Sequence, residues 1–150
     1  MTMVDEVGTA DAVLVVEEQM SILAGQIRAG IRNAALAVDP GLQPFGLKLL
    51  RLLMRCGPTH ASAAAESLYV DRSVISRQAK QLEELGLITI QADPADGRAR
   101  FLEMTPSAAV RVSEAIASNH IVLHDRMNSW TSDELLTFAD FIARLNGTSE

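Results

Sequence analysis

Cationic side chains gather in two neighbouring segments in the second half of the sequence. Residues 93–100 read Asp-Pro-Ala-Asp-Gly-Arg-Ala-Arg and carry Arg98 and Arg100. A second group, in which cations alternate with serines, lies upstream and consists of Arg72, Ser73, Ser76, Arg77 and Lys80. Guanidinium and ammonium groups bind phosphates, arginine also pairs with guanine, and serine hydroxyls donate to phosphates or base edges. These residue types therefore predict recognition of nucleic acid.

The upstream group belongs to a stretch, 72–85, with the pattern of an amphipathic helix. Asp71 is a suitable N-cap and Gly86 a suitable end. At 100° per residue the serines, Arg77, Lys80 and Glu84 share one face, with Glu84 expected beyond the edge of a bound duplex. The opposite, mostly apolar face consists of Ile75, Gln78, Ala79, Leu82 and Leu85. A charged stripe alone more often marks a solvated amphipathic helix, so the neighbouring elements decide its meaning.

The segment 93–100 lies between two short apolar runs, 87–92 and 99–104, with Asp96-Gly97 as a central turn pair. Alternation with β-branched residues on both sides of such a pair predicts a β-hairpin. A basic helix followed at once by a basic-tipped hairpin is suited to nucleic acid. The helix fits the wide groove, and the hairpin fits the narrow groove or the backbone.

Helical patterns fill most of the remaining sequence. A long one over 11–38 has an apolar seam of coiled-coil type, which requires a partner surface in its own chain or another. That seam consists of Val13, Val16, Met20, Leu23, Ile27, Gly30 and Ala34. Asp39-Pro40-Gly41 should end this helix, and a second is expected over 44–55. A short third helix should begin at Thr59 or Ser62 and end near Tyr69.

Two further helices are expected after the hairpin. Thr105-Pro106 predicts the start of one that runs to about Asn128. Thr131-x-x-Glu134 has the form of a capping box for a last helix, ending at 146–147. Residues 1–10 are expected to be frayed.

Composition limits the classes of protein. At 150 residues the chain forms one domain or a small core with dimerising extensions, and its core must be aliphatic because only 4% of residues are aromatic. The net charge is −6, yet residues 71–100 hold five basic and five acidic side chains, so the acidic excess lies elsewhere. No run is long enough for a membrane span. The acidic N-terminus and the single cysteine favour a reducing cytoplasm.

Residues 57–106 resemble the winged helix-turn-helix of the MarR family of bacterial regulators. The matching stretches are Asp71-Arg72-Ser73-Val74-Ile75-Ser76-Arg77, Leu82-Glu83-Glu84-Leu85-Gly86-Leu87-Ile88, Asp93-Pro94-Ala95-Asp96-Gly97-Arg98 and Met104-Thr105-Pro106. The Asp-Pro-x-Asp-x-Arg wing is the most specific of them. The chain differs at Tyr69, in a turn where Gly is common and where a bulky residue with positive φ would be strained.

The resemblance implies a mostly α (α+β) fold and an obligate homodimer. Residues 11–41 and 106–147 would form the dimerisation helices, and 42–105 the DNA-binding domain. The chain would be a transcriptional regulator, most simply a repressor, with its recognition helices in consecutive major grooves of a near-palindromic operator. A small aromatic or phenolic effector would bind between the dimer helices and the DNA-binding lobes. The DNA-contacting residues would be Arg72, Ser73, Ser76, Arg77, Lys80, Asp96, Arg98 and Arg100, with Asp96 positioning Arg98.

Parts of the sequence also fit two other classes of function. A winged helix can serve as a protein-interaction module without DNA, which the net acidity favours. His120 and His124 have the i, i+4 spacing of half a zinc site, but no carboxylate or cysteine cluster completes it. No P-loop, dinucleotide fingerprint or nucleophile elbow appears, so neither an enzyme nor a cofactor is expected. Cys56 ends an apolar helix and is expected to be buried rather than redox-active.

Overall fold

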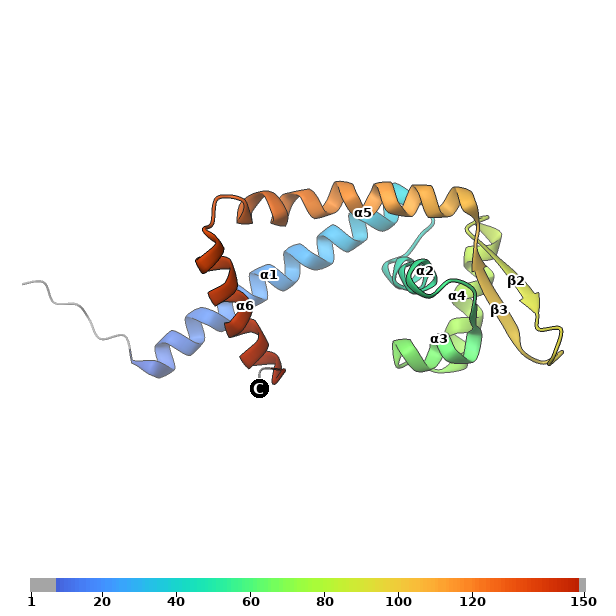
Figure 1. Cartoon of the computed structure of the whole chain (residues 1–150), viewed down its shortest axis with the longest axis horizontal. Helices are drawn as coiled ribbons and strands as arrows, with labels where there is room; N and C mark the ends of the chain where they lie inside the picture. Colours follow the sequence, from blue (N-terminus) through green and yellow to red (C-terminus); the bar gives the residue numbers. More distant parts are fainter. Residues whose placement is uncertain (1–7, 149–150) are drawn as a thin grey trace, which may run out of the picture.

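The computed structural model describes residues 8–148, except for the side chains of residues 120 and 121. It is an elongated molecule with a small lobe at one end and long helices reaching away from it (Figure 1). In chain order the elements are α1 (Thr9–Val38), α2 (Pro44–Cys56), β1 (Thr59–His60), α3 (Ala61–Leu68), α4 (Arg72–Glu84), β2 (Ile88–Ala92), β3 (Arg100–Met104), α5 (Pro106–Met127) and α6 (Ser132–Asn146). The predicted mostly helical fold with a small sheet is confirmed.

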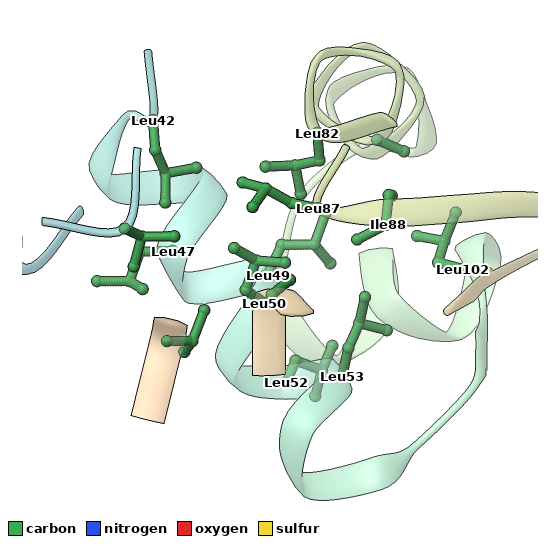
Figure 2. Packing of buried hydrophobic residues seen from close by; sticks show 14 of the residues in the cluster. Leu42, Leu47, Leu49, Leu50, Leu52, Leu53, Leu82, Leu87, Ile88 and Leu102 are labelled. Atoms are coloured by element: carbon green, nitrogen blue, oxygen red, sulfur yellow. The ribbon is translucent and has the colours of Figure 1, made fainter. Parts of the chain in front are cut away.

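The lobe is assembled around α2, whose leucines pack against several neighbouring elements. Leu49 and Leu50 are completely buried, and Leu52 and Leu53 nearly so. They join one aliphatic cluster with Leu82 of α4, Leu87, Ile88 and Leu102 (Figure 2). Burying a leucine contributes about 1.5–3 kcal/mol, so this cluster holds the helices and the sheet together.

A glycine sets the approach of α2 to its neighbours. A Cβ at Gly46 would lie 2.6 Å from Leu42 Cδ1 and 3.2 Å from Leu82 Cδ2. Both distances are shorter than ordinary van der Waals contact, so a larger residue would displace the Leu42 side chain and crowd Leu82 of α4. Gly46 thereby helps to set the position of α4 on the lobe.

The sheet has three antiparallel strands in the order β1-β3-β2. The expected hairpin forms β2 and β3, with Ile90 opposite Leu102. The strand β1 was not predicted and has only two residues: Thr59 pairs with Leu102 and His60 with Phe101. Two residues carry no detectable alternation. The third helix, expected to begin at Thr59 or Ser62, begins between these two positions, at Ala61.

The long helices differ in how much of them is covered. α5 packs alongside the C-terminal part of α1, where Ala34, Ala35 and Val38 are buried (Figure 1). An Arg111 guanidinium N–H on α5 donates to the carbonyl of Val38 and strengthens this junction. The N-terminal part of α1 and the whole of α6, in contrast, contain no buried residue within the described range.

The helix ends agree well with the sequence signals. Thr105 caps α5 by accepting from the Ala108 N–H, and Thr131 with Glu134 forms the predicted capping box of α6. The expectation that residues 1–10 are frayed is wrong for Thr9 and Ala10, which are helical, while residues 1–7 lie outside the described range. None of the helices in the described part of the chain is long and apolar enough to cross a membrane.

Candidate nucleic-acid interface

The helix α4 is fixed to the lobe by one side only. Ile75 and Leu82 are fully buried and Ala79 is 2% exposed, so these three residues seat the helix on α2 and α3. Asp71 occupies the N-cap position as expected, but its side chain makes no capping hydrogen bond. Packing of the apolar side, more than local capping, therefore holds α4 in place.

The other side of α4 presents the residues that the sequence singled out. All of them, together with Glu84, are exposed: Arg72, Ser73, Ser76, Arg77 and Lys80. Among the described residues none of the three cations belongs to an ion pair. Their charges are therefore uncompensated within the subunit and able to bind phosphate oxygens.

The hairpin between β2 and β3 carries the second predicted group. Its loop is closed by backbone bonds from Asp93 N–H to Ala99 O (3.1 Å) and from Ala99 N–H to Asp96 O (3.0 Å). A two-residue type I′ turn, which Asp-Gly often forms, requires positive φ at both central residues. Gly97 is not among the glycines with positive φ, so the hairpin does not close with that turn. The result is a seven-residue tip from Asp93 to Ala99 between the strands.

Acidic side chains shape this tip. Asp96 Oδ1 accepts the backbone N–H of Arg98 at 3.1 Å, and Asp93 Oδ1 accepts that of Ala95 at 2.8 Å. The Arg98 side chain is exposed. Arg100 instead folds back, because its Nη1 donates to the carbonyls of Gly97 (2.9 Å) and Ala99 (3.2 Å). Arg98 is thus the freer of the two wing guanidinium groups.

A histidine that the sequence analysis passed over supports the base of the wing. The His60 ring stacks on Phe101 with centroids 3.9 Å apart, and its Nε2 lies 3.4 Å from Asp93 Oδ2. Asp93 therefore links the loop to β1 as well as shaping the turn. Only the pairing of β1 with β3 brings these residues together, and a two-residue strand leaves no sequence signal for it.

The wing and α4 are joined as one unit. Glu83 Oε2 accepts the backbone N–H of Ile90 in β2 at 3.1 Å. Thr105 Oγ1, at the end of the hairpin, donates to the Gly86 carbonyl just after α4 at 3.1 Å. The basic face of α4 and the arginine-bearing tip are therefore held at a fixed spacing.

The other candidates do not form a site. Cys56 is exposed, which corrects the expectation that it is buried: it is the last residue of α2, where the helix leaves the core. His124 is exposed, and the side chain of His120 lies outside the described residues. Among the side chains that are described, no group of three or more histidine, cysteine or acidic residues is placed to hold a metal ion.

A short helix, a tight turn, a second helix with an exposed basic face and an antiparallel hairpin define a winged helix-turn-helix, a class of DNA-binding protein. Comparison with known proteins identifies the family. Residues 47–99 match the MarR family. The uncharacterized HTH-type transcriptional regulator YxaD of Bacillus subtilis is 32% identical over 99 residues, which make up 65% of this chain and 68% of that protein.

Two further similarities extend over more of the chain. The HTH-type transcriptional repressor MdtR of Bacillus subtilis is 26% identical over 110 residues, 73% of this chain and 71% of that protein. A MarR family protein from Bacillus stearothermophilus has the same fold, with a TM-score of 0.73 at 16% identity, over 93% of this chain and 96% of that one. The chain therefore belongs to the MarR family of DNA-binding transcriptional regulators, which are not enzymes.

Proposed function

We propose that this regulator is a homodimeric repressor that binds a near-palindromic operator, with α4 in the major groove and the wing in the minor groove. The observation that carries this proposal is the exposed, unpaired cationic face of α4 held rigidly beside the exposed Arg98. Lysine and arginine would supply the general affinity by releasing counterions, and Ser73, Ser76 and Arg77 would read bases. Arg72, Lys80, Asp96 and Arg100 complete the proposed interface.

The dimer is supported by apolar residues that residues 8–148 leave exposed. We call them the uncovered apolar face: Val13, Val16 and Met20 of α1 with Leu136, Phe141 and Leu145 of α6. Each is 44% to 69% exposed, and α6 has no buried residue at all. Exposed apolar area of this extent in two long helices is typical of a subunit interface.

A second copy of the chain is the proposed occupant of that face, because the seam of α1 has the spacing of a helix that packs against another helix. The two termini would interleave there, away from the DNA-binding lobes at the other end of the molecule (Figure 1). Two-fold symmetry then places the half-sites about 10 bp apart, centre to centre.

Release by a small molecule is supported by a cavity of about 410 Å³ between α1, α2 and α5. Its walls include Ile27, Leu47 and Ile116, and the charged groups in its described lining are Arg51 and Arg126. An aromatic or phenolic anion would match both the apolar walls and the guanidinium groups. Because α2 belongs to the lobe and α1 and α5 to the long helices, such a ligand would favour one lobe spacing over another.

Repression follows from operator occupancy that blocks transcription, and it is the role stated in the name of the relative MdtR. Acting on DNA, the protein would work in the cytoplasm. Footprinting of the DNA upstream of its own gene is the direct test. Protection of two half-sites about one helical turn apart supports the proposal. Equal, weak binding to every duplex, with no dependence on salt, would instead indicate a protein-interaction module.

Arg77→Ala tests the reading face. We expect a loss of about 1–3 kcal/mol in operator affinity and relaxed specificity at one base position. Glu84→Gln is the matched control, since Glu84 lies on the same face of α4, is exposed, and is expected beyond the duplex edge. An Arg77→Ala variant that binds the operator as tightly as the wild type would contradict the assignment of Arg77 as a base-reading residue.

A further inference from the structure

Tyr69 has a backbone conformation that few residues of its size adopt. With φ 55° and ψ 44° it lies in the left-handed helical region, and it is the one non-glycine residue with positive φ in the described part of the chain. The other positive-φ positions, Gly57, Gly86 and Gly147, also follow helices, and there glycine avoids the Cβ clash. At the end of α3 the same geometry is imposed on a tyrosine, where it is strained.

Within the described residues, only backbone hydrogen bonds at the end of α3 offset this strain. The side chain of Tyr69 is 95% exposed. Within residues 8–148 it has no aromatic partner, and its hydroxyl makes no hydrogen bond. Only its backbone is engaged: the Tyr69 N–H donates to Glu66 O (3.3 Å) and to Ala65 O, and the next N–H, that of Val70, donates to Ala65 O (3.1 Å). A strained residue with an unused side chain points to a function outside the subunit.

The position of Tyr69 suggests what that function is. It lies in the turn between α3 and α4, three residues before Arg72, so at most about 10 Å of chain separates it from the start of α4. In helix-turn-helix proteins the first residues of the recognition helix meet the base edges, and the phosphate backbone runs beside them. Tyrosine hydroxyls are among the groups that donate to phosphate oxygens.

We propose that Tyr69 is a DNA-contacting residue whose phenolic hydroxyl donates a hydrogen bond to a backbone phosphate next to the bases read by α4. The inference rests on the proposed entry of α4 into the major groove. Because the donor is neutral, the contact adds affinity without releasing a counterion. Since it reaches a phosphate and not a base, it positions α4 without reading sequence.

Two substitutions separate this role from simple strain. Tyr69→Phe keeps the ring and the conformation and removes only the hydroxyl. We expect it to weaken binding to an operator duplex roughly tenfold or more, because a hydrogen bond to a charged acceptor is lost. The slope of affinity against salt concentration should not change, and base preferences should be those of the wild type. Tyr69→Gly should relieve the strain and raise Tm by about 2–4 °C while binding at least as weakly as Tyr69→Phe.

The measurement is a titration of the full-length protein against a duplex selected by the wild type from a random pool, at two salt concentrations, with Arg77→Ala alongside. Tyr69→Phe or Tyr69→Gly binding as tightly as the wild type, while Arg77→Ala binds weakly, would overturn the role of Tyr69 alone. Equal binding by all the variants, Arg77→Ala included, would show that α4 does not enter the groove and would overturn the proposed function as well. A changed salt slope in Tyr69→Phe would contradict a neutral phosphate contact.

Discussion

Leucines in α2 and in α6 have opposite surroundings. Leu50 in α2 is completely buried, whereas Leu136 and Leu145 in α6 are 69% and 63% exposed. Both helices are amphipathic, and α6 has the better local start, with a complete capping box. The buried cluster around α2 draws on residues 34–115, while among the described residues the N-terminal part of α1 and all of α6 contribute nothing to it. Thus one region supplies its own core, whereas the other leaves its apolar side chains exposed among the described residues.

The largest effect is expected from a charge on the uncovered apolar face. Val16→Glu places a carboxylate in the α1 seam, and in a symmetric dimer it does so twice, at about 3–5 kcal/mol for each buried, unpaired charge. Sedimentation should therefore show a monomer. Val15→Glu is the matched control, because Val15 is 55% exposed against 54% for Val16 but lies outside the seam. Equal dissociation by both variants would contradict the assigned seam.

In the lobe, the corresponding change is Leu50→Ala. The cavity left at a fully buried leucine should lower the free energy of unfolding by about 2–5 kcal/mol. Urea unfolding followed by circular dichroism measures this loss. Leu136→Ala is the comparison: it should raise the dimer dissociation constant and change the stability of the lobe little. If both variants unfold alike, the lobe is not independent of the dimerisation helices.

A smaller effect is expected at the tip of the wing. Arg98→Ala should reduce operator affinity by about 1.5 kcal/mol and lower the slope of log affinity against log salt by about one unit. Arg144→Ala, in α6, removes the same charge from an exposed position far along the chain from the wing and should leave the slope unchanged. An unchanged slope in Arg98→Ala would exclude Arg98 from the phosphate contacts.

The smallest effects are expected at two N-caps. Thr131→Ala breaks the capping box of α6 and should cost about 1 kcal/mol. Asp71→Ala, at the start of α4, should cost only a few tenths, because the Asp71 side chain makes no capping bond. Thermal unfolding of both variants compares them directly. A loss of stability for Asp71→Ala that exceeds the loss for Thr131→Ala would contradict the absence of a capping hydrogen bond from the Asp71 side chain.

Much of the fold could be predicted because its signals are local. Helix ends at Thr105 and Thr131, the buried side of α4 and the hairpin all follow from caps, periodicity and turn residues in short stretches. β1 could not be predicted, since a strand of two residues exists only through its pairing with β3. The exposure of Cys56 was also missed, because an apolar helix does not reveal where it leaves the core.

Some features of the candidate site could likewise be predicted from the sequence, and others could not. Exposure of the cations and serines of α4 follows from helix geometry alone. The folding back of Arg100 onto the loop carbonyls, and the stacking of His60 on Phe101 beside Asp93, depend on a loop shape and a strand pairing that the sequence does not encode locally. The assignment of Arg98 as the wing-tip contact, with Asp96 positioning it, comes from the family resemblance, and the Arg98→Ala titration tests it.

The separation between the uncovered apolar face and α4 has a genetic consequence. A mutant subunit with a damaged α4 keeps α1 and α6 intact and would still pair with normal subunits in the same cell. Each mixed dimer would contain only one intact α4 and would bind its operator weakly. Lesions in α4 should thus behave as dominant alleles, whereas lesions such as Val16→Glu, which prevent pairing, should be recessive.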